Sequence, residues 1–130
     1  MKFLYPLRII ELIGHGVIFM WNHYVIEKFS VAVRELALGE GHLKQKLMHA
    51  CFGLMLINPE DLPGLLRSEF RSLKERAMGV KPAGEVTGCA ETINTLNPNQ
   101  VKQAVKTILK LHEEILKRDP LHEYHDRPKP

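Results

Sequence analysis

Histidine and cysteine are the residue types of this chain with the greatest capacity for chemistry, and its 130 residues include seven histidines and two cysteines. His42 and His49 stand two helical turns apart, which would place both rings on roughly one face of a helix. A zinc-binding helix usually offers two histidines four positions apart with a carboxylate nearby, and that pattern is missing here. His112 falls on an apolar stripe, where a core histidine is the usual reading. We therefore expect no metal site at these positions.

The cysteines suggest nucleophilic chemistry, which also requires a base and an orienting group. Cys51 lies inside an apolar run, where a free cysteine behaves as a small buried hydrophobe. Cys89 follows Thr87 and Gly88 in a segment with loop composition, so we expect it to be more exposed and more reactive. The sequence supplies no base for it and no phosphate-binding loop. We expect no cofactor and no enzyme activity, with an enzyme that uses a reactive Cys89 as the least favoured alternative.

A basic ladder runs along the last predicted helix, where Lys102, Lys106 and Lys110 recur every four residues. Such a ladder is usually a solvated face, but it can also follow a phosphate backbone. The net charge is only +3, no aromatic residue interleaves with the lysines, and Glu113 and Glu114 follow closely. A nucleic-acid-binding regulator that uses this face is therefore the second hypothesis.

Length and composition indicate one globular domain, with 45% apolar and 25% charged residues. The first 21 residues are apolar, yet Glu11 and His15 interrupt them, so they are too short and too polar to span a bilayer. No convincing signal-peptide cleavage site follows. The two cysteines do not form a disulfide framework, although they could form one bond. We expect reduced thiols, no membrane association and a cytoplasmic location.

Helical periodicity and capping residues outline the elements that must position these side chains. Asn58-Pro59 and Asn97-Pro98 each combine a capping Asn with a Pro suited to a first helical turn, and Asp61 and Gln100 follow at the capping-box position. Glycines mark helix ends after residues 38 and 78. The predicted helices cover residues 23–38, 42–57, 62–78 and 98–118, preceded by one or two helical pieces within 6–21 and with a turn or two of helix at 90–96.

The middle of the chain resembles a group of small helical bacterial proteins of unknown function. The resemblance rests on Gly39-Glu-Gly-His-Leu, on Pro59-Glu-Asp-Leu-Pro and on Thr92-Ile-Asn-Thr-Leu, and it spans roughly residues 30–117. His42-Leu43 replaces the Ser-Ile of the group's helix start. The shared motifs are turns and helix caps. The resemblance therefore implies a helical fold and bacterial origin, but no activity and no site residues.

These observations predict an all-α fold, a compact bundle of four to five helices in a single domain at 1–118, with a disordered tail at 119–130. In that tail, His122, Glu123 and His125 leave a weak adventitious nickel or zinc site open. The leading hypothesis for function is a non-catalytic interaction protein, an adaptor or regulator in a bacterial cell. Surplus apolar helix surface predicts a homodimer, although the same surfaces could pack within one chain. The predicted interface residues are Trp21, Tyr24, Met48, Phe52 and Met55.

Overall fold

The computed structural model describes the backbone of residues 15–118 and the side chains of residues 23–118. Within that part the chain forms five α-helices, one short 3-10 helix and no strand, which confirms the all-α fold. The segment before His15 and the predicted tail at 119–130 lie outside the described residues. The elements are α2 (His15–Leu38), α3 (Leu43–Leu54), η1 (Pro59–Asp61), α4 (Gly64–Met78), α5 (Cys89–Asn94) and α6 (Pro98–Lys117).

Helix α2 begins earlier than predicted, because residues 15–22 belong to the same helix as residues 23–38. The prediction of separate elements was wrong at this point. Gly16 and the apolar residues after it therefore belong to one continuous helix with residues 23–38. At the other end the amide of Gly39 donates to the carbonyl of Glu35 at 2.9 Å. Gly41 then takes the left-handed conformation with φ of 95°, which reverses the chain into α3.

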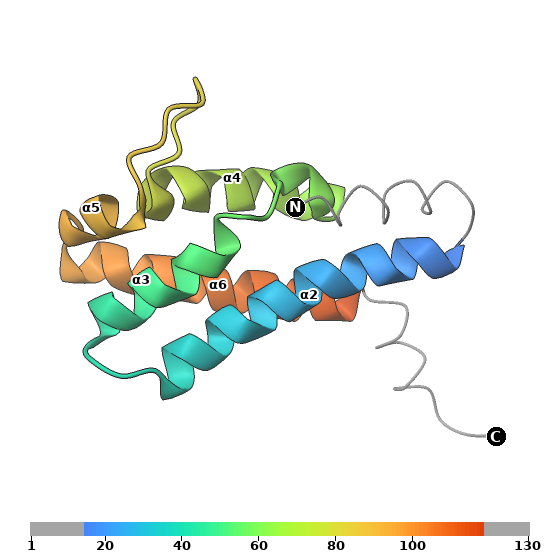
Figure 1. The fold of residues 1–130 in the computed structure, drawn as a ribbon, viewed down its shortest axis with the longest axis horizontal. Coiled ribbons are helices and arrows are strands. Elements are labelled where there is room, and N and C mark those ends of the chain that lie inside the picture. Colours follow the sequence, from blue (N-terminus) through green and yellow to red (C-terminus); the bar gives the residue numbers. More distant parts are fainter. Residues whose placement is uncertain (1–14, 119–130) are drawn as a thin grey trace.

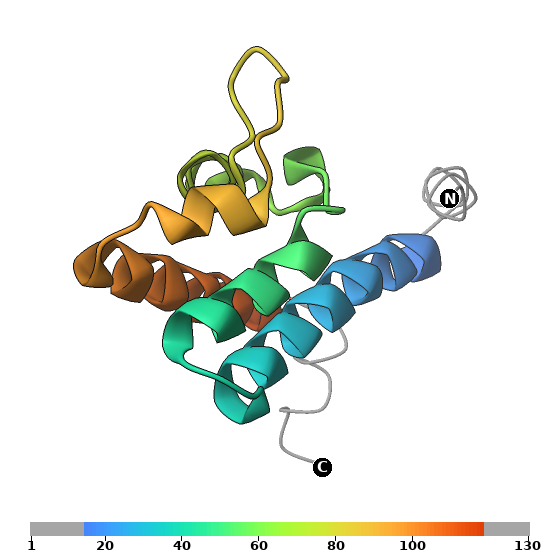
Figure 2. The same cartoon turned by 60° about the vertical axis from the view of Figure 1, so that its left-hand side comes forward.

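The helices pack as two crossed pairs around one core (Figures 1 and 2). Helix α2 lies along α3, while α6 packs against both α2 and α4, and the short α5 closes the end between α3 and α4. The rings of Phe29 on α2 and Phe70 on α4 meet at the centre, with their centroids 5.6 Å apart. Apolar side chains along each long helix are buried in this core, including Val25, Leu36, Leu47, Leu66, Leu73, Ala77, Ile108 and Ile115.

The two Asn-Pro signals lead to different structures. Asn97 and Gln100 form a complete capping box at the start of α6, with both hydrogen bonds at 2.8 Å. Asn58 instead accepts from the amide of Glu60 at 3.0 Å and caps the three residues of η1. Leu62 precedes Pro63 and is extended, since a residue before proline avoids helical angles. The helix therefore stops and restarts at Gly64 as α4, without a side-chain cap.

The connection between α4 and α5 protrudes from the bundle (Figures 1 and 2). Gly79 ends α4 in the left-handed conformation with φ of 70°, as its type predicted. Val80 and Val86 then pair in an isolated antiparallel bridge. The predicted turn or two of helix at 90–96 is confirmed as α5, which contributes Cys89 and Ile93 to the core.

Candidate interaction surface

The candidate interaction surface lies on α3 and on the turn that follows this helix. Its inner stripe, Leu47, Ala50, Cys51 and Leu54, is buried against the neighbouring helices. The opposite side carries Gln45, His49 and Phe52, and Leu56 follows in the turn after the helix; we call these four residues the α3 outer face.

Two large side chains dominate the α3 outer face. Phe52 is 50% exposed and Leu56 is 64% exposed. Phe52 lies in the last turn of α3, and Leu56 lies in the turn that directly follows the helix. The imidazole of His49 leans against the Phe52 ring, with the centroids 6.2 Å apart and the planes tilted by 43°. The arrangement is an amphipathic patch with an apolar centre and a polar edge, which suits contact with another protein.

The other predicted interface residues lie closer to the core than Phe52. Met48, Met55 and Tyr24 are half-buried and pack against the core cluster. The ammonium group of Lys28 lies 5.7 Å from the centroid of the Tyr24 ring. Burial raises the pKa of Tyr24, and the charges of Asp61 and then Glu27 add to this. Trp21 belongs to α2, but its side chain lies outside the described residues.

Apolar residues are also exposed elsewhere in the described part, singly rather than as a helix face. Leu65 on α4 is 81% exposed and Leu38 at the end of α2 is 77% exposed. Isolated exposed leucines are normal on soluble proteins and need no partner. Leu65 therefore provides a comparison residue for the α3 outer face.

The basic ladder is exposed along α6, as its spacing predicted. Its last member, Lys110, forms an ion pair with another helix, since its ammonium lies 3.3 Å from a Glu69 carboxylate oxygen on α4. Lys102 lines a cleft of about 280 Å3 together with His42 and Lys44. The Lys44 ammonium donates to the carbonyl of Asn94 at 3.2 Å. Nucleic-acid binding by the ladder stays a prediction.

A second cleft, of about 370 Å3, lies on the other flank of the α5–α6 connection. Arg76, Asn99 and Gln103 give it a polar rim, and Leu96 and Ala104 give it an apolar floor. Gln100 also lines this cleft, but its side-chain oxygen already accepts from the amide of Asn97. The cleft thus contains hydrogen-bonding groups without an assembled nucleophile and base.

The prediction that Cys89 is exposed was wrong, because its relative exposure is 2%. Gly88, with φ of 105°, turns the chain so that Cys89 begins α5 and points into the core rather than remaining in the loop. Composition identified the loop correctly up to Gly88, but it could not reveal which side of the new helix faced inward. A surface-exposed catalytic thiol at this position is therefore excluded in this conformation.

The histidines have local roles. The His42 side chain caps α3 by accepting from the amide of Gln45 at 3.4 Å. His112 on α6 is half-buried, as its apolar stripe suggested, and its Nε2 lies 3.1 Å from the Ser30 hydroxyl on α2. Burial lowers the pKa of His112. Among the described residues, no group of three or more His, Cys, Asp or Glu side chains is arranged to hold a metal ion.

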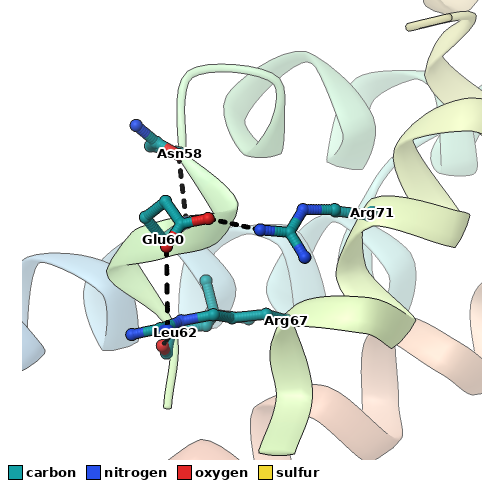
Figure 3. A network of polar contacts seen from close by, with 5 residues as sticks. All are labelled: Asn58, Glu60, Leu62, Arg67 and Arg71. Atoms are coloured by element: carbon teal, nitrogen blue, oxygen red, sulfur yellow. Dashed lines mark hydrogen bonds and ion pairs between the residues drawn. The ribbon is translucent and has the colours of Figure 1, made fainter. Parts of the chain in front are cut away.

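Charged residues that the sequence analysis did not single out attach the turn at η1 to α4 (Figure 3). Glu60 pairs with Arg71 and lies 3.7 Å from Arg67, whose Nε also donates to the carbonyl of Leu62 at 2.9 Å. The two arginines are four positions apart, and this spacing was the available signal that one carboxylate could meet both. Lys74 acts in the same region by donating to the carbonyl of Ile57 at 2.8 Å. These contacts position the turn and contain no reactive group.

Searches with the whole chain found no matching family model, no matching characterised protein and no matching solved structure. Within the described part of the chain, no helix has the length and apolar character needed to cross a membrane.

Proposed function

We propose that this protein is a non-catalytic helical interaction module, an adaptor or regulator of the bacterial cytoplasm that binds a second copy of itself through the α3 outer face. The observation that carries the proposal is the exposure of Phe52 and Leu56, at 50% and 64%, in the last turn of α3 and in the turn that follows it. Burying large apolar side chains is the main source of binding free energy at protein interfaces.

The surroundings of α3 support this assignment. The helix is held from the inner side by α2, α5 and α6, so its outer face is presented on a packed scaffold. A rigid face loses little conformational entropy on binding. Pairing about a two-fold axis would bring the same residues of both copies together, which is the commonest arrangement in homo-oligomers.

The test measures the mass of the full chain by light scattering from low to high micromolar concentration. We expect a dimer mass at the upper end. Phe52→Glu and Leu56→Glu should each raise the dimer dissociation constant at least about tenfold, because each would bury a carboxylate without a partner. Circular dichroism of the variants would verify that the helices are retained.

Leu65→Glu is the matched control, since it places the same charge at a more exposed leucine on α4. It should leave the dimer mass unchanged. A monomer mass for the unmodified chain at high micromolar concentration would refute self-association. A dimer that tolerates Phe52→Glu as well as it tolerates Leu65→Glu would refute the assignment to the α3 outer face.

A further inference from the structure

The two cysteines lie close together inside the bundle although they are far apart in the sequence. Cys51 is on α3 and Cys89 is the first residue of α5, and these two helices pack against each other. Both thiols are free, and their residues have relative exposures of 0% and 2%. They belong to one cluster of buried core residues, and the side chain of each shifts the pKa of the other. Hence the core contains a pair of thiols rather than two isolated ones.

The two members of this pair differ in acidity. A hydrogen bond from Cys51 lowers the pKa of Cys89, because it stabilises the Cys89 thiolate. The same hydrogen bond, together with burial, raises the pKa of Cys51. Thiolates are the nucleophilic form of cysteine. Cys89 also begins α5, next to the exposed connection that precedes this helix, so it is the thiol that reacts first, and Cys51 is placed to attack the product.

Access to the pair runs through α5. This helix has six residues, and among them Cys89 and Ile93 are buried. It follows the protruding connection, whose residues 81–87 are all exposed. A short helix with few buried side chains opens locally at much lower cost than the whole fold. Opening of α5 would expose Cys89 to a small oxidant while α3 stays in place.

We propose that Cys51 and Cys89 form an oxidisable dithiol, which a peroxide converts into a disulfide that joins α3 to α5. The Cys89 thiolate attacks one oxygen of hydrogen peroxide, the O–O bond breaks, and the departing hydroxide takes a proton to become water. The Cys51 sulfur then attacks the resulting sulfenic acid, so that the S–S bond forms, the S–O bond breaks and a second water leaves. In sum, two thiols and one peroxide give one disulfide and two waters. Such reversible bonds in reducing compartments usually serve redox sensing.

The test treats the reduced full chain with hydrogen peroxide, alkylates the remaining thiols in denaturant and maps the peptides by mass spectrometry. We expect the mass of a single chain that has lost two hydrogens, and a linked pair of peptides that contain Cys51 and Cys89. A dithiol reductant should reverse both changes fully. Glutathione in the same vessel provides the reference for an ordinary exposed thiol.

Single variants separate the two roles. In Cys51→Ser, a sulfenic acid should accumulate at Cys89 and be trapped by dimedone. In Cys89→Ser, Cys51 should be oxidised at least about tenfold more slowly than Cys89 in the companion variant, because Cys51 is fully buried on α3, which stays in place when α5 opens. Cys51→Ala offers a second variant if the serine disturbs the core. Two thiols that survive while glutathione is consumed, or bonds that form only between chains, would overturn the proposal.

Discussion

At the scale of single residues, the contact between Ser30 and His112 couples the fold to pH. The Ser30 hydroxyl and His112 Nε2 are 3.1 Å apart across the α2–α6 contact. Burial lowers the pKa of His112 below the value of about 6.5 that it has in an unfolded chain. As the pH falls through 6.5, His112 of the unfolded chain becomes protonated, whereas His112 of the folded protein stays neutral. Folding stability from this residue is therefore present above about pH 6.5 and is lost as the pH falls toward the folded pKa.

The prediction concerns His112→Gln, which retains a hydrogen-bonding group but does not titrate. Between about pH 5 and 8, the free energy of unfolding of this variant should depend less on pH than that of the unmodified protein. Urea denaturation at several pH values measures the difference. His49→Gln is the control, since His49 is exposed on α3. Parallel pH profiles for the unmodified protein and His112→Gln would contradict the burial argument.

At the scale of elements, two capping asparagines that look alike in the sequence differ in what they support. Asn97 begins the twenty residues of α6 and belongs to a two-bond capping box. Asn58 begins the three residues of η1 and accepts one hydrogen bond. Losing a cap from a long helix that packs on the core destabilises the whole fold, whereas losing one from a single turn affects that turn.

Asn97→Ala should therefore lower the free energy of unfolding by about 1 kcal/mol or more. Asn58→Ala should cost clearly less, because Glu60 remains paired with Arg71. Chemical denaturation monitored by circular dichroism compares the two variants. Asn99→Ala, an exposed change within the first turn of α6, is the control. Equal losses at positions 97 and 58 would show that η1 is as important to the fold as α6.

The capping signals also show how far the sequence could predict these elements. The ends of α6 and the stop at Gly79 were readable because a cap is local chemistry, set by residues within one turn. The interruption after Asp61 depended on Pro63, which is the second residue of the predicted helix 62–78 and moves the start of the helix to Gly64. The burial of Cys89 depends on the direction that the chain takes after Gly88, and no local sequence pattern specifies this direction. Phe52 was recognisable as apolar, but its outward position depends on which face of α3 the other helices cover.

At the scale of the whole molecule, the pair Phe29–Phe70 connects the first described helix to α4. Both residues are fully buried, and their rings meet with centroids 5.6 Å apart at a tilt of 56°. The Lys74 ammonium lies 5.5 Å from the centroid of the Phe70 ring and also donates to the carbonyl of Ile57. This cluster therefore links α2, α4 and the connection that follows α3 into a single core.

Phe70→Ala should lower the free energy of unfolding by about 3–5 kcal/mol, because it removes a buried ring and leaves a cavity that the helices cannot fully close. Leu65→Ala on the same helix should change it by less than about 0.5 kcal/mol, since Leu65 is 81% exposed. Urea titration of both variants gives the comparison. A small effect of Phe70→Ala would mean that the core repacks around the missing ring.

The protruding connection between α4 and α5 has a consequence for handling the protein. Its base is fastened by main-chain hydrogen bonds, from the amide of Lys81 to the carbonyl of Glu85 at 2.7 Å and from the amide of Thr87 to the carbonyl of Gly79 at 2.8 Å. Its tip, around Gly84, is exposed, with open space around it. A peptide inserted at the tip would begin and end at almost the same point. The fold should therefore tolerate the insertion, as proteins usually do at exposed loop tips. An affinity tag or a fluorophore could be carried there, with both chain ends and the α3 outer face left unaltered.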